Sequence, residues 1–130
     1  NFQSSKIISG ADYASALNQI PQPGRMIDEI FNDYDLILTP TMACKTPFIG
    51  ELNTMSEDTD SYLTLLYQMI GFTALINDTG HPAASLPLGA SSDGMPVGSQ
   101  LIAPFGREDL LYQLGFILEQ ENRFTEKPIL

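Results

Sequence analysis

Two side chains in this sequence have the chemistry of a catalytic base or a strong nucleophile: His81 and Cys44, the only histidine and the only cysteine. A nucleophilic site needs a nucleophile, an activating base and an oxyanion hole within reach of one another. His81 follows Thr79 and Gly80, and no partnered serine or cysteine is indicated nearby. The favoured interpretation is a loop histidine held by backbone partners. A Cys44–His81 dyad is a weaker alternative, because Lys45 is the only cationic neighbour of Cys44.

The acidic residues do not suggest a metal site. A metal ion needs three or four clustered ligands, and His81 with Asp78 supplies too few. The other acids are scattered, which is typical of a solvated acidic surface. No glycine-rich motif that could hold a phosphate is present. From the residues alone we therefore expect no metal, no cofactor and no catalytic site within the chain.

The charge of the chain limits its partners. Sixteen acidic and six basic residues give a net charge of −10 at pH 7, which repels phosphate backbones and anionic lipids. Neither a membrane-spanning run of about 18 apolar residues nor a signal peptide pattern is found. We therefore expect no nucleic-acid partner and no membrane partner. The single cysteine excludes an internal disulfide and fits a reducing compartment, so we expect a cytoplasmic protein.

The first part of the chain predicts helices. Ser9 has the position of an N-cap with Asp12 as its capping-box partner, so a helix should begin near Gly10. The prolines of residues 21–24 should break or kink it, and apolar spacing predicts a second helical piece over residues 26–31. The expected result is a helix pair, or one helix with a defect.

A buried strand and a long loop should follow. Residues 35–39 form an almost continuous apolar run that Pro40 stops, which is typical of a strand buried on both faces inside a sheet. Residues 42–55 contain several turn formers and no period, and we predict a long loop. Long loops in compact domains are often functional or covered by a partner.

The second half predicts two more helices. Asp58 or Asp60 should cap the first of them, and Gly71 should weaken it at a place of close approach. Residues 107–109 should open the last helix with acids at its positive end. The two predicted apolar faces are Leu63, Leu66, Tyr67, Ile70 and Ala74, and then Leu110, Leu111, Leu114, Ile117 and Leu118.

Between those helices the sequence predicts an antiparallel hairpin. Its strands are residues 83–89 and 97–103, and Asp93-Gly94 supplies the positive φ of a tight turn. A two-stranded hairpin is not stable alone in water, so other elements must cover it. The order of elements predicts an α/β or α+β layer arrangement. We expect residues 1–130 to form a single segment, frayed over 1–8 and 122–130.

Four blocks of residues carry a family resemblance. The chain resembles the C-terminal portion of the amidase signature family of carbon–nitrogen hydrolases, in block order and spacing, over residues 9 to 121. This resemblance implies an α/β fold in which strands of a large mixed sheet have flanking helices. The matching blocks are residues 31–41, 77–89, 94–104 and 108–111.

The resemblance also implies where catalysis takes place. The family hydrolyses amides with a Ser-Ser-Lys triad that lies upstream, in a lysine-containing segment and a Gly/Ser-rich signature. Here Ser4-Ser5 and Ser91-Ser92 lack that glycine-rich setting, and the lysines are Lys6, Lys45 and Lys127. We therefore expect no catalytic residue in this chain, and an upstream portion is also expected because the sequence begins with Asn1. The chain should be inert alone and should self-associate when isolated from the upstream amidase polypeptide.

By the same resemblance, Ile70, Ala74 and Asn77 contact the substrate. The first two lie on the helix that leads into the Asn77 loop, and they should face a small linear amide in the full enzyme. In the glutamine-using branch an acidic residue stands seven positions before this asparagine. Ile70 occupies that position here and favours a more apolar amide. The structural alternatives are plain helix core for Ile70 and Ala74 and a loop-shaping hydrogen bond for Asn77.

Two other functions remain open. The chain could be a stand-alone, non-catalytic binding or assembly module that retains part of the fold. It could also be a subunit of a tRNA-dependent amidotransferase, which Ile70 and the acidic charge disfavour.

Overall fold

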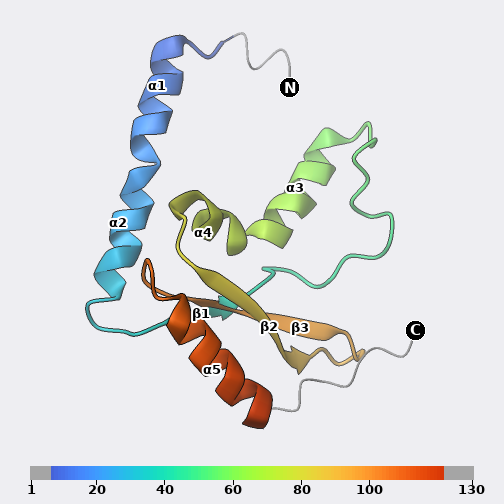
Figure 1. Cartoon of the computed structure of the whole chain (residues 1–130). Helices are drawn as coiled ribbons and strands as arrows, with labels where there is room; N and C mark the ends of the chain where they lie inside the picture. The colour runs from blue at the N-terminus through green and yellow to red at the C-terminus, as the bar shows by residue number, and fades with distance from the viewer. Residues whose placement is uncertain (1–6, 122–130) are drawn as a thin grey trace.

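The computed structural model describes residues 7–121, which form five helices and three strands in an α/β arrangement (Figure 1). The predicted fraying of residues 1–8 and 122–130 mostly lies outside these residues. Ile7 and Ile8 are described, and both are exposed. The elements are α1 (Gly10–Gln19), α2 (Pro21–Ile30), β1 (Ile37–Pro40), α3 (Thr59–Ile70), α4 (Thr73–Thr79), β2 (Ala83–Ala90), β3 (Pro96–Ile102) and α5 (Glu108–Glu121).

The three strands form an antiparallel sheet in the order β1-β3-β2. Successive side chains of the central strand β3 point to opposite faces and enter two different cores. On one face Ile102 packs with Ile27 of α2 and Ile76 of α4. On the other face Leu101 and the neighbouring Ala103 pack with Leu111 of α5. Helices therefore cover both faces of β3.

The prediction that residues 35–39 form an interior strand is wrong for the described sheet, because β1 lies at its edge. Ile37 faces the core of α2 and α4, whereas Leu38 is 64% exposed. An unbroken apolar run indicates burial on both faces only if neighbouring elements cover both faces. Here Leu38 is left largely in solvent.

The hairpin is present as predicted. Gly94 has a φ of +85°, and its N–H donates to the Ser91 carbonyl at 2.9 Å. The pairing of β2 with β3 is irregular between Leu86 and Gly89. This interval contains Pro87, which has no N–H to donate.

Gly94→Ala is expected to destabilise the chain by about 1 kcal/mol, because a side chain at positive φ is strained. Gly115→Ala in α5 is the matched control. A methyl group there meets nothing within 4 Å. Removing a glycine from a helix interior should stabilise by about 0.5–1 kcal/mol. Urea unfolding measures both, and equal effects of the two substitutions would contradict the account of the turn.

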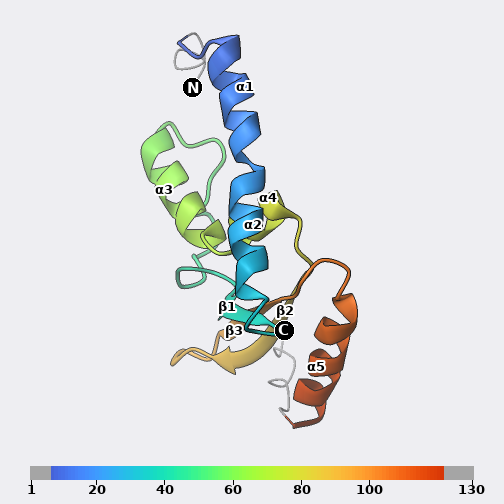
Figure 2. The ribbon, with the colours of Figure 1, turned by 90° about the vertical axis from the view of Figure 1, so that its left-hand side faces the viewer.

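The first two helices form the expected pair, and both views show them end to end (Figures 1 and 2). The capping box is present, with Ser9 N donating to Asp12 Oδ2 at 2.8 Å and Asp12 N donating to Ser9 Oγ at 3.1 Å. The Ser9 hydroxyl, which donates to Asp12 Oδ2 at 2.6 Å, and to a lesser degree Ser9 N hold the pKa of Asp12 below its ordinary value. The break lies at Ile20, and α2 begins at Pro21 rather than near residue 26. Proline in a first turn forfeits no helical hydrogen bond.

The single helix expected from residue 63 to Ala74 is in fact two helices, α3 and α4. Asp58 caps α3, since its Oδ1 accepts from Ser61 N at 3.1 Å. Helix α3 ends at Ile70, and Gly71 follows as its C-cap. A methyl group added at Gly71 would lie 3.1 Å from Ala43 Cβ. The predicted close approach at this glycine is thus confirmed. The carbonyl of Phe72, the N-cap of α4, accepts from Gln100 Nε2 at 3.3 Å, which ties the break between the two helices to the sheet.

The last helix begins as predicted, but its buried face is narrower. Leu111 is buried and Leu114 and Leu118 pack against the same core, at helical spacing. Ile117 is 54% exposed and does not belong to this face. None of the helices over residues 7–121 is long and apolar enough to cross a membrane.

Candidate functional site

His81 is buried and is held by side chains rather than by the expected backbone partners. Its Nδ1 lies 3.0 Å from Thr79 Oγ1, and its Nε2 lies 3.1 Å from Asp28 Oδ1. Phe105 and Phe31 flank the ring at centroid distances of 4.3 and 5.7 Å. The expectation of backbone partners is wrong because Asp28 stands 53 residues away, where no local pattern reveals it.

The side chains of Thr79, His81 and Asp28 are linked in the order hydroxyl, imidazole, carboxylate, as in a catalytic triad. In a catalytic triad, however, the nucleophile must also be able to reach the substrate. The Thr79 hydroxyl contacts the Ile76 carbonyl at 3.3 Å in the last turn of α4, and the His81 side chain has no exposed surface. Neither of the two main cavities found in the described residues is lined by these three residues. The cluster therefore ties α2 to the end of α4.

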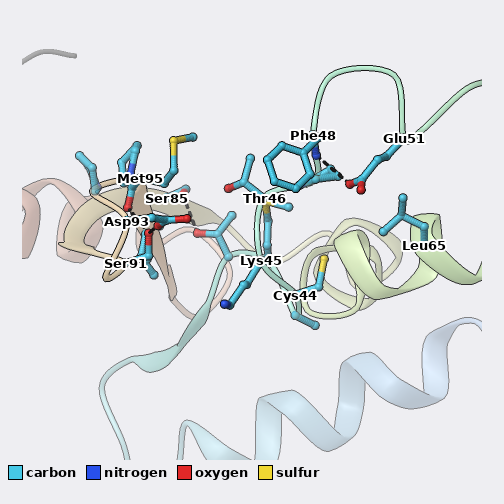
Figure 3. A pocket seen from close by; sticks show the side chains of 18 residues that line it. Cys44, Lys45, Thr46, Phe48, Glu51, Leu65, Ser85, Ser91, Asp93 and Met95 are labelled. Atoms are coloured by element: carbon cyan, nitrogen blue, oxygen red, sulfur yellow. Dashed lines mark hydrogen bonds between the residues drawn. The ribbon is translucent and has the colours of Figure 1, made fainter. Parts of the chain in front are cut away.

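The larger cavity has a volume of about 1070 Å³ and opens between the hairpin and the loop that follows β1 (Figure 3). Cys44 and Phe48 line it from the loop, Leu65 from α3, and Met95 from the hairpin. His81 does not line it, and both ring nitrogens of His81 are engaged elsewhere. The structure therefore does not bring the Cys44–His81 dyad together.

Two hydroxyl groups meet within this cavity. Thr41 Oγ1 and Ser85 Oγ lie 2.6 Å apart, and either one can donate. Ser85 lies in the outer strand β2 and Thr41 directly follows the outer strand β1, and the two side chains meet across Gly98 of the central strand β3. An added methyl group at Gly98 would lie 2.8 Å from Thr41 Oγ1 and 3.1 Å from Ser85 Oγ. Only glycine at this position lets the hydroxyls meet.

The carboxylates at the cavity accept hydrogen bonds from residues of their own loops. Glu51 Oε2 accepts from Phe48 N at 2.7 Å, and Asp93 accepts from the Ser91 hydroxyl. This Ser91 hydrogen bond is the main reason why the pKa of Asp93 lies below its ordinary value, and the charge of Lys45 adds a smaller effect. Within residues 7–121 no group of three or more His, Cys, Asp or Glu side chains could hold a metal ion.

The three residues expected to contact substrate lie near the break between α3 and α4. Ile70 ends α3 and Ala74 lies in α4, and both are half-buried. Asn77 is exposed and belongs to α4 rather than to a loop, which corrects that expectation. None of the three lines the large cavity. The Thr41–Ser85 pair was missed, although a glycine inside a strand, such as Gly98, signals close approach.

The family model "Amidase" matches residues 1–112. The chain belongs to the amidase family. This amidase chain is 37% identical over 119 residues to the 6-aminohexanoate-cyclic-dimer hydrolase of Paenarthrobacter ureafaciens, covering 86% of the chain and 24% of the hydrolase. It is 33% identical over 102 residues to a glutamyl-tRNA(Gln) amidotransferase subunit of Halothermothrix orenii, covering 78% of the chain and 20% of that protein.

Solved structures agree with the sequence match. The amidase chain superposes on 6-aminohexanoate cyclic dimer hydrolase with a TM-score of 0.79 at 33% identity, covering 92% of the chain and 26% of that structure. A substrate complex of the same kind of hydrolase gives a TM-score of 0.72. The chain thus spans about a quarter of the length of these relatives, and the matched part is their C-terminal part. The predicted resemblance is confirmed.

Proposed function

We propose that this chain is the C-terminal part of an amidase that hydrolyses a small amide to a carboxylic acid and an amine. It supplies core and pocket wall, and the Ser-Ser-Lys residues that perform the chemistry lie outside it. The observation that carries this proposal is the match to the C-terminal 24% of a 6-aminohexanoate-cyclic-dimer hydrolase, together with the match to the amidase family model. The buried His81 supports it, because both of its nitrogens are engaged and it offers no free base.

The coding sequence upstream of Asn1 tests the proposal directly. A lysine-containing segment followed by a Gly/Ser-rich signature is the expected result. An upstream region without them would overturn the catalytic role of the parent protein.

Exposed apolar side chains support a larger partner polypeptide. Phe48, Ile49 and Met55 are 81%, 108% and 85% exposed. Burying each such side chain is worth about 1.5–3 kcal/mol, so a covering segment would stabilise the chain. The isolated chain is expected to self-associate or to melt early. A monodisperse monomer with a cooperative thermal transition in size-exclusion and melting experiments would favour the stand-alone module instead.

Ile70, Ala74 and Asn77 are proposed to form part of the substrate wall. Their support is positional: Ile70 and Ala74 flank the break that Gln100 ties to the sheet, and Asn77 lies one turn beyond Ala74 in α4. The family match includes all three residues. We propose an apolar amide as substrate. The relative's name specifies a cyclic dimer, so linear and cyclic amides both belong in the assay.

Ile70→Asp is expected to change substrate preference. In a chimera in which this chain replaces the matched part of the Paenarthrobacter ureafaciens hydrolase, the new carboxylate should pair with a substrate ammonium. The ratio of kcat/KM for an ammonium-bearing amide to that for an uncharged amide should rise about tenfold. Gln68→Asp, an exposed position on the same helix, is the control and should leave the ratio unchanged. Equal shifts in both variants would contradict a wall role for Ile70.

A subunit of a tRNA-dependent amidotransferase is a second candidate, supported by the 33% identity to the Halothermothrix orenii protein. Ile70 in place of an acidic residue and the net charge of −10 weigh against it. We also propose a cytoplasmic location, because a chain with one cysteine has no internal disulfide and is suited to a reducing compartment.

A further inference from the structure

The large cavity has apolar rims on both sides. One rim is the loop after β1, where Phe48 is 81% exposed and its neighbour Ile49 is 108% exposed. The other rim is the hairpin, where Met95 is 46% exposed (Figure 3). Val97 also lines the cavity from the hairpin and is 44% exposed. Exposed apolar side chains gathered at a cavity mark an interaction site more often than apolar side chains scattered singly over the surface.

The polar groups of the cavity determine which kind of ligand it can bind. Glu51 caps its own loop at Phe48 N, and Asp93 is bonded to Ser91 and lies close enough to Lys45 to feel its charge. Because both carboxylates already have partners within the chain, the cavity does not favour an ionic ligand. The Thr41–Ser85 hydroxyl pair keeps a donor and acceptors for a neutral polar group. A suitable occupant is apolar, uncharged and able to form one or two hydrogen bonds.

Size and position favour a polypeptide segment over a small molecule. The volume of about 1070 Å³ lies just above the range of small-molecule pockets, which is roughly 300–1,000 Å³. Ile70, Ala74 and Asn77 do not line it, so it is separate from the proposed substrate wall. The hydrolase relative is about four times as long as its matched part, because the match covers 24% of it.

We infer that this cavity receives an apolar segment of the amidase polypeptide from outside the matched part. The side chains of that segment pack between Phe48 and Met95, and its backbone amide groups bond to the Thr41–Ser85 pair. The source of the segment rests on the proposed function. The inference that the cavity is a binding surface depends instead on its exposed apolar rims, on the Thr41–Ser85 hydroxyl pair, and on the carboxylates of Glu51 and Asp93, which are already hydrogen-bonded within the chain.

Cys44 is a built-in reporter because it is the chain's only cysteine and lines the cavity. The rate of its maleimide labelling is to be compared between the isolated chain, at a dilution at which size-exclusion shows it to be monomeric, and the chimera, each normalised to the unfolded protein. Tryptic cleavage after Arg25 and Lys45 isolates Cys44 in a peptide of residues 26–45 for mass spectrometry. Seating of the segment should slow labelling at least about tenfold in the chimera. Equal rates in both proteins would overturn the inference.

A matched pair of variants tests the docking contact. Phe48→Ser should restore fast Cys44 labelling in the folded chimera and leave the melting of the isolated chain unchanged, because Phe48 is already exposed there. Phe116→Ser, an exposed phenylalanine on α5, should restore nothing. Equal effects of the two variants would contradict a specific seat at the cavity.

The two proposals fail in different ways. Fast labelling in a chimera that hydrolyses amide would overturn the docking site alone. Slow labelling in a chimera without hydrolysis would support the docking site and contradict the proposed function.

Discussion

His81→Ala is expected to lower the free energy of unfolding by about 2–4 kcal/mol, the largest effect of any single substitution considered for this chain. The substitution removes hydrogen bonds to Thr79 and Asp28 and the ring packed against Phe105. It also leaves a void, because the His81 side chain has no exposed surface. Urea unfolding followed by circular dichroism measures the loss.

Two further variants separate the parts of this effect. Asp28→Asn keeps a polar partner for His81 and should cost clearly less than His81→Ala. Hydrogen exchange should show that His81→Ala loosens α2 and α4, which the cluster joins, more than α5 on the other face of the sheet. A loss below about 0.5 kcal/mol, typical of a surface substitution, would contradict the role of His81 in joining the helices.

Gly98→Val is expected to cost about 1–3 kcal/mol, because it overpacks the centre of the sheet. The first carbon of any side chain there already lies 2.8 Å from Thr41 Oγ1. The outer strands β1 and β2 must then move apart, and the Thr41–Ser85 hydrogen bond is lost. Thermal unfolding reports the loss of stability.

The control for this prediction is another glycine of the same sheet. Gly89 lies in β2, and an added methyl group there meets Val97 Cβ at an ordinary 3.9 Å. Gly89→Ala should therefore be nearly neutral. Combining Thr41→Gly with Gly98→Ala should recover part of what Gly98→Ala alone loses, since the closest clash is removed. A Gly98→Val protein as stable as the parent would show that Gly98, Thr41 and Ser85 are not tightly packed.

Features that depend on residues a few positions apart were predicted well. The Ser9–Asp12 capping box, the Asp58 cap and the Gly94 turn all need only local geometry. The start of α5 after Arg107 belongs to the same class. Helix caps and tight turns are determined by residues close together in the chain, so they can be predicted from a single sequence.

Features that depend on distant contacts were not predictable in the same way. The edge position of β1, the Asp28 partner of His81 and the break after Ile70 depend on packing between segments far apart in the chain. The apolar run of β1 indicated burial on both faces, yet Leu38 is exposed in the described chain. A covering segment of the amidase polypeptide would remove this discrepancy.

The candidate site shows the same division. Ile70, Ala74 and Asn77 were proposed from family blocks, and their contact with substrate stays a prediction. The Thr41–Ser85 pair joins residues 44 positions apart, and no local spacing brings them together. Family membership, by contrast, was predictable because the order and spacing of several blocks persist along the chain, and the family match confirms it.

The most direct test of the central claim is amide hydrolysis by the chimera of this chain with the Paenarthrobacter ureafaciens hydrolase. The rate of acid and amine release is to be measured for the chimera, the isolated chain and the hydrolase lacking its matched part. We expect hydrolysis by the chimera and none by either part alone. Hydrolysis by the isolated chain, or none by a folded and monodisperse chimera, would contradict it.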